Sequence, residues 1–110
     1  MPKKQHSNLH KNPNVHHLYI IYDFQERIIY KFGISDKPVN NAKISSRLAS
    51  QIKLYNRVAG SKRFAGRIIS YPIAGRLQAR QLEDEWILKF KAKRKRLPIG
   101  NENHQFLKKN

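Results

Sequence analysis

The sequence predicts an α+β fold, a small three-stranded sheet flanked by helices in the order strand, strand, helix, strand, helix. Two apolar runs rich in β-branched and aromatic residues lie on either side of a short polar turn, which predicts a hairpin. Two later segments carry apolar residues at intervals of three and four positions, which predicts helices. A chain of 110 residues fits one domain of this kind.

The first two strands are predicted at residues 17–22 and 28–34, where Ile, Tyr and Phe predominate. The polar residues 23–27 between them are too few for a crossover helix. The two strands should therefore pair antiparallel. Gly33, near the end of the second strand, indicates a bulge or the close approach of another segment.

A polar loop follows, and then a helix that is predicted to end at Gly60. The apolar face of this helix has spacings of four, four and three: Ile44, Leu48, Ile52 and Tyr55. Residues 63–71 are predicted as the third strand, which Pro72 should end.

The second helix begins after Gly75, and its apolar stripe is expected at Ala79, Leu82, Trp86 and Phe90. Three acids stand together on it. Glu83 is expected at the border of the stripe, and Asp84 is expected to face solvent with Arg80 as its partner. Glu83 is either an ordinary helix acid paired with a base or an oxygen ligand for Mg²⁺.

The charge is strongly positive, with 23 Lys and Arg against 7 Asp and Glu and a formal net charge of +16. Nucleic acid is the expected partner, because cations that contact phosphates release counterions. An anionic membrane surface is a second class, but no segment has the broad apolar face that it needs. The chain has no cysteine, which excludes disulfides, thiolate metal sites and a cysteine nucleophile.

Several residues in this order resemble the GIY-YIG nuclease family. Tyr19 matches the tyrosine of the first motif, and Gly33, in Tyr30-Lys31-Phe32-Gly33, matches the glycine of the second. Arg47 matches a helical arginine and Glu83 a metal-binding glutamate. His17 replaces a glycine of the first motif, and Lys31-Phe32 replaces Tyr-Ile in the second, as a lysine does in restriction-enzyme members of the family.

A longer pattern is similar to the nuclease domains of bacterial polymorphic toxins: Tyr30 to Ser35, Ser45-Ser46-Arg47, Gly75-Arg76 and Gly100-Asn101. The resemblance covers residues 16–104 and implies a three-stranded antiparallel sheet. Residues 1–15 are then predicted to be a flexible basic arm, and 105–110 a basic tail. No signal peptide or transmembrane segment is expected, so the protein should be cytoplasmic or delivered as a toxin.

The resemblance implies an endonuclease that hydrolyses DNA with Mg²⁺, or another divalent cation such as Mn²⁺. The catalytic candidates are Tyr19, Lys31, Arg47 and Glu83, with Glu83 holding the metal and Asn101 and His104 as further candidates. Either Lys31 lowers the pKa of Tyr19, or Lys31 itself takes the proton of the attacking water.

Nucleic-acid contacts are expected from a further set of residues: Arg47, Gln51, Arg76, Lys93, Arg94, Lys95 and Arg96. The resemblance implies DNA as the substrate, with RNA as the alternative. A toxin of this class also implies an acidic inhibitor protein. The competing interpretation is a non-catalytic nucleic-acid-binding domain, and the distinction depends on whether the four catalytic candidates converge on one concave site.

Overall fold

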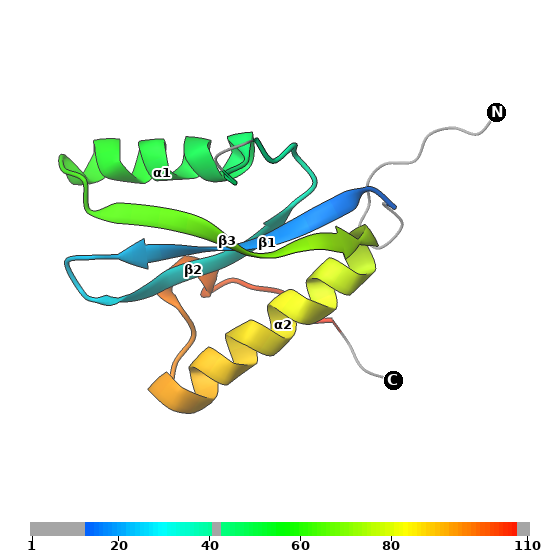
Figure 1. Ribbon diagram of the computed structural model, residues 1–110. Helices are drawn as coiled ribbons and strands as arrows, with labels where there is room; N and C mark the ends of the chain where they lie inside the picture. The colour runs from blue at the N-terminus through cyan, green and yellow to red at the C-terminus, as the bar shows by residue number, and fades with distance from the viewer. Residues whose placement is uncertain (1–12, 41–42, 108–110) are drawn as a thin grey trace.

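The computed structural model describes residues 13–40 and 43–107. It confirms the predicted α+β fold, a three-stranded sheet with one long helix on each face (Figure 1). The elements are β1 (Val15–Asp23), β2 (Ile28–Ser35), α1 (Ser46–Ala59), β3 (Phe64–Ala74), α2 (Gly75–Arg94) and the short 3₁₀ helix η2 (Ile99–Asn101). Within the described ranges, no helix has the length and apolar character needed to cross a membrane.

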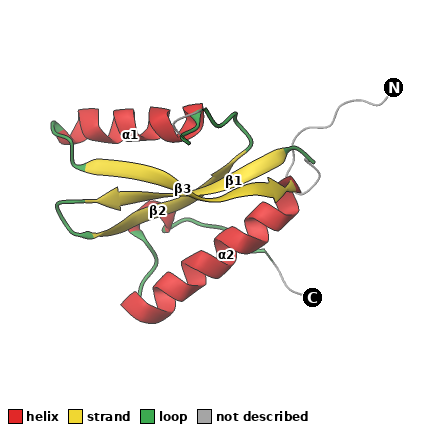
Figure 2. Ribbon diagram, in the orientation of Figure 1, coloured by secondary structure: helices red, strands yellow, loops and turns green. Residues whose placement is uncertain are grey.

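The strand β1 is the centre of the sheet, with β2 and β3 antiparallel on either side (Figure 2). Its side chains alternate between the two faces. Tyr19 and Ile21 pack with Leu48 on the α1 face, whereas Leu18 packs with Ala79 on the α2 face. The central strand is therefore buried on both sides.

The helix α1 is fixed to β1 at its first turn. Ser45 is its N-cap, and the Ser45 Oγ accepts a hydrogen bond from the Leu48 backbone N–H at 3.1 Å. The same oxygen lies 2.9 Å from Nε2 of the buried His17 on β1. Gly60 ends the helix as predicted, with a φ of 73° in the left-handed region.

Two sequence predictions about the edges of elements were wrong. The strand β3 does not stop at Pro72 but runs to Ala74, because Pro72 lies on an edge strand at the irregularity between the pairs Leu18–Ser70 and His16–Ile73. Ile44 lies just before α1, although it packs in the cluster around Leu48 as expected.

The buried face of α2 also differs from the predicted stripe. Its buried residues are Ala79, Glu83, Ile87 and Phe90. Trp86 is 38% exposed, and Leu82 is only partly buried. The observed face has the same helical periodicity as the predicted stripe. Because one of its residues is an acid, the apolar pattern predicted the neighbouring Leu82 and Trp86 instead.

A partly buried ion pair, with Asp23 buried and Arg63 partly exposed, holds the turn between β1 and β2. The Asp23 carboxylate accepts hydrogen bonds from Nε of Arg63 at 2.9 Å and from Nη2 at 2.7 Å. It also accepts from the backbone N–H groups of Gln25 and Glu26. These hydrogen bonds, that of Arg63 first, hold the pKa of Asp23 below its usual value.

This pair predicts a specific pH dependence of stability. Because the native pKa of Asp23 is depressed, its contribution is complete above the unfolded-state pKa of about 4 and is lost as the pH falls through the native value. Asp23→Asn should therefore lower the urea midpoint at neutral pH and flatten its decline on acidification. Glu102→Gln, at an exposed position, is the control and should change neither; a parallel decline in Asp23→Asn would contradict the prediction.

Candidate active site

A pocket of about 470 Å³ lies at the edge of the sheet formed by β2. Each of the four catalytic candidates lines it, and each comes from a different element: Tyr19 from β1, Lys31 from β2, Arg47 from α1 and Glu83 from α2. Arg76, Arg80, Asn101 and His104 also line the pocket. Residues separated by more than 60 positions in the sequence therefore meet at one concave surface.

The position of Tyr19 depends on Gly33, its partner across the β1–β2 pair. The phenol ring of Tyr19 lies over Gly33, where a Cβ atom would stand 2.3 Å from Tyr19 Cζ. The ring is 1% exposed, and its hydroxyl donates a hydrogen bond to Oε1 of Gln51 at 2.9 Å. Gly33 thus allows the close approach that brings the hydroxyl to the pocket.

The pKa values of Tyr19 and Lys31 move in opposite directions. Burial raises the pKa of Tyr19, and the nearby Arg47 only partly offsets this rise. Burial lowers the pKa of Lys31, Arg47 lowers it further, and the carboxylate of Glu83 opposes the fall. Burial therefore favours the uncharged form of each group: it keeps the proton on Tyr19 and promotes the loss of a proton from Lys31.

Glu83 is more buried than the sequence indicated, with 6% of its surface exposed. Its Oε1 lies 3.8 Å from Nε of Arg80, a long ion pair. Burial raises the pKa of Glu83, whereas His104 and Arg80 act in the opposite direction. Burial therefore disfavours the charged form of this carboxyl group, and the nearby bases compensate only in part.

The donor set of the pocket fits Mg²⁺ through the buried carboxylate of Glu83, and Asp36 is a second carboxylate that lines the pocket. No group of three or more His, Cys, Asp or Glu residues in the described part of the chain could hold a metal. Mg²⁺ is commonly held by one or two carboxylates, with water and substrate phosphate oxygens completing its shell. The incompletely paired oxygens of Glu83 match that pattern.

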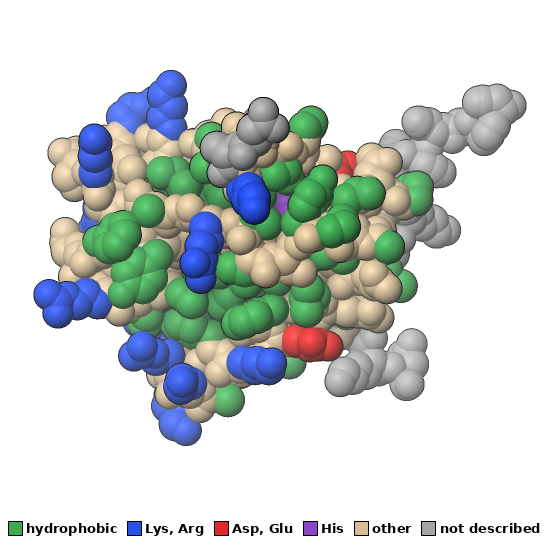
Figure 3. Space-filling view, viewed as in Figure 1, with side chains coloured by type: hydrophobic (Ala, Val, Ile, Leu, Met, Phe, Trp, Pro, Cys, Tyr) green, Lys and Arg blue, Asp and Glu red, His purple; other side chains and the backbone are tan. Residues whose placement is uncertain are grey.

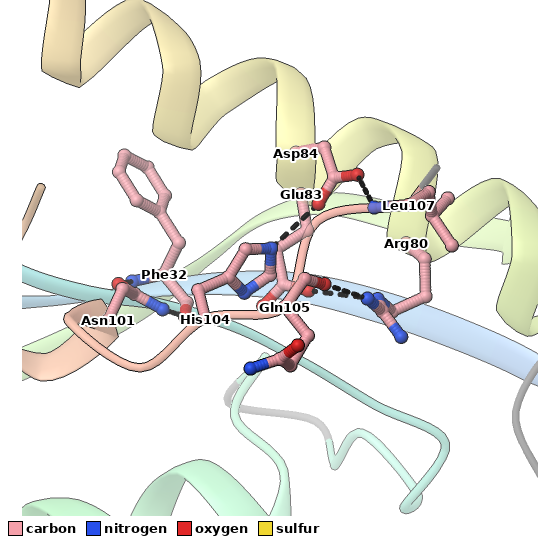
Figure 4. Close-up of polar contacts among 8 residues, drawn as sticks. All are labelled: Phe32, Arg80, Glu83, Asp84, Asn101, His104, Gln105 and Leu107. Atoms are coloured by element: carbon pink, nitrogen blue, oxygen red, sulfur yellow. Dashed lines mark hydrogen bonds and ion pairs between the residues drawn. The ribbon is translucent and has the colours of Figure 1, made fainter. Parts of the chain in front are cut away.

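Asp84 does not face solvent with Arg80 as its partner, as the sequence predicted. Its Oδ1 lies 2.7 Å from Nε2 of His104, and its Oδ2 accepts from the Leu107 N–H at 2.9 Å (Figure 4). Arg80 instead donates to the backbone oxygen of Gln105. The segment after α2 folds back along the helix and covers this face, which periodicity within the helix cannot reveal.

Asn101 stabilises the free edge of β2. Its Oδ1 accepts from the Phe32 N–H at 2.8 Å, and its Nδ2 donates to the Phe32 carbonyl at 2.9 Å. Gly100 permits this contact, because a Cβ there would lie 2.8 Å from Lys31 Cβ. η2 thus fixes the strand that carries Lys31.

The residues expected to bind nucleic acid fall into three places. Arg47 and Arg76 line the pocket, and Gln51 contacts the Tyr19 hydroxyl. Residues 93–96 are exposed at the opposite end of α2, about 15 Å or more along the helix from Glu83. Lys and Arg side chains gather at that end on the face shown in Figure 3. Arg80, which the sequence analysis did not select as a site residue, could have been found from its one-turn spacing to Arg76.

The protein family described as URI fold toxin 2 matches residues 9–95, most of the chain. The chain belongs to this family. No curated protein and no solved structure gives a significant match. The described fold of this URI fold toxin therefore places one cationic pocket, with a single buried glutamate, at the edge of a three-stranded sheet.

In this URI fold toxin, Gly33→Ala should destabilise the protein and displace the Tyr19 ring. The added methyl group would overlap a buried ring, and overpacking of this kind costs about 2 kcal/mol. Urea unfolding measures the loss. Gly66→Ala is a comparison for crowding elsewhere in the core, because its added Cβ would meet Leu48, Ile52 and the Ile20 carbonyl but not the Tyr19 ring. A Gly33→Ala protein as stable as the unaltered protein would contradict the close approach of the ring.

Proposed function

We propose that this toxin is a metal-dependent endonuclease that hydrolyses phosphodiester bonds of DNA, with an active site of the GIY-YIG type. One observation carries the proposal: Tyr19, Lys31, Arg47 and Glu83 line a single pocket although they come from four elements. A domain that only binds nucleic acid needs a basic surface, but it does not need a buried acid among these groups. The convergence therefore favours catalysis over binding alone.

The roles follow from the chemistry of each side chain. Arg47 binds the scissile phosphate and stabilises the charge that develops on its oxygens. Tyr19 and Lys31 hold the attacking water, and one of the two takes its proton. Glu83 would hold Mg²⁺ or Mn²⁺, which when bound adds positive charge at the phosphate. Arg76 and Arg80 extend the positive wall beyond Glu83.

We infer that the exposed bases Lys93, Arg94, Lys95 and Arg96 contact the backbone of the same nucleic acid. Their distance from Glu83 along α2 is about 15 Å or more. Phosphates of one strand recur about every 3.4 Å along the axis of duplex DNA, so these bases would contact phosphates beyond the scissile one. Parallel assays on DNA and RNA of the same sequence identify the substrate.

The central prediction concerns Glu83. Glu83→Gln should lower cleavage of supercoiled plasmid in Mg²⁺ by about a thousandfold, because charge stabilisation at the phosphate is lost. Thermal stability should stay the same or rise, since burial disfavours the charged form of this side chain. Glu85→Gln, at an exposed position on the same helix, is the control and should remain active.

Cleavage by Glu83→Gln at the unaltered rate would refute the metal site and with it most of the nuclease proposal. Asp84 is unsuitable as a neutral control, because its carboxylate holds His104 and Leu107. Loss of these hydrogen bonds would change the pocket wall through folding and not through chemistry.

We propose further that an acidic inhibitor protein covers this pocket. The chain carries a net charge of +16, and complementary charge accelerates association. Induced expression of the unaltered protein without such a partner should stop the growth of bacterial cells, whereas Glu83→Gln should be tolerated. Colony counts measure the difference. Normal growth with soluble, cleavage-competent protein present would contradict this proposal.

A further inference from the structure

The hydrogen bond between Tyr19 and Gln51 has a defined donor and acceptor. It donates its only proton to Oε1 of Gln51, with the two oxygens 2.9 Å apart. The Arg47 guanidinium also contributes a hydrogen bond to this hydroxyl, so the capacity that remains is one lone pair of its oxygen, and Tyr19 lines the pocket. A water molecule in the pocket can therefore donate a hydrogen bond to Tyr19, whereas Tyr19 has no second proton to donate.

The fold fixes both partners of this hydrogen bond. Gln51 is half-buried on α1, one turn after Arg47, and the ring of Tyr19 is fixed by its contact with Gly33. An acceptor that binds the phenol proton stabilises the neutral phenol over the phenolate. Burial of the ring acts in the same direction and raises the pKa of Tyr19.

The charged and titratable groups around Tyr19 come from each element packed against it: His17 on β1, Lys31 on β2, Arg47 and Tyr55 on α1, and Glu83 on α2. Arg47 favours the phenolate through a hydrogen bond and through its charge, but burial is the largest single effect and the pKa of Tyr19 stays raised. Lys31, in contrast, loses its proton more readily than a solvent-exposed lysine because burial lowers its pKa.

We propose that Gln51 is a positioning residue that keeps Tyr19 a neutral phenol, so that Tyr19 orients the attacking water and Lys31 takes its proton. This inference rests on the proposed nuclease function. The water proton passes to the unprotonated Nζ of Lys31, and the water oxygen bonds to phosphorus. The bond from phosphorus to the leaving oxygen breaks with its electron pair, and that oxygen takes a proton from solvent.

A double-mutant cycle tests whether Gln51 acts through Tyr19. Gln51→Met should lower kcat roughly ten- to hundredfold with little change in KM, because the water loses its orientation. In a Tyr19→Phe background the same substitution should have no further effect. Gln81→Met, the same change at an exposed position of α2, should match the unaltered protein. Independent, multiplicative effects, or a change confined to KM, would overturn the inference and return Gln51 to nucleic-acid contact.

A fluorinated tyrosine at position 19 tests the protonation state. Ring fluorination lowers the phenol pKa. If Tyr19 gave up its proton in the reaction, the acidic limb of the kcat–pH profile would shift to lower pH by the same amount. We expect the limb to stay in place. A limb that shifts by the full change in phenol pKa would overturn the assignment to Lys31.

The ¹⁹F resonance of the same protein gives a readout that does not need activity. Gln51→Met should lower the phenol pKa of the fluorinated Tyr19, because the acceptor that stabilised the neutral form is gone. A rise would mean that Gln51 donates to Tyr19 and would overturn the inference. If the unaltered protein and Gln81→Met both fail to cleave, the proposed function fails, and this titration still decides the direction of the hydrogen bond.

Discussion

Burial of the strand β1 on both faces is the constraint on which the rest of the structure depends. Side chains of a strand alternate, so Leu18 must be covered by one helix and Tyr19 and Ile21 by the other. The two helices therefore lie on opposite faces and approach the β2 edge from opposite sides (Figure 1). The pocket forms where they meet the edge, with Arg47 from one side and Glu83 from the other.

The electrostatics of the pocket follow from the same geometry. Lys31 and Tyr19 lie on the face covered by α1, and burial disfavours the charged form of each. Glu83 is covered from the α2 side, and burial disfavours its charge as well. The groups that would contact a bound phosphate and its counterion are therefore poorly solvated in the free protein. Poor solvation of ionisable groups is common in binding and catalytic sites.

Much of the fold could be predicted from the sequence, because its signals are local. The hairpin, the helix ending at Gly60 and the third strand depend on residues close together in the chain. The buried face of α2 could not be predicted in this way. Placing Glu83 inward and Trp86 outward requires knowledge of the pocket that Glu83 lines, which is formed by distant segments. Asp84 shows the same limit, since its partner His104 comes from a segment with no periodic pattern. The candidate site residues were selected by resemblance, and the structure adds their common location.

The contact between η2 and the edge of β2 also affects how the shape and charge of the pocket can vary. The matched family region ends at residue 95, whereas Asn101 and His104 lie beyond it and still line the pocket. One wall of the pocket is thus contributed by a segment that is separable in sequence from the sheet and both long helices. Asn101 must remain for β2 to stay in place, because it binds both backbone groups of Phe32. A change in length or charge after Asn101 would therefore alter the opening of the pocket with less effect on the strands that carry Tyr19 and Lys31.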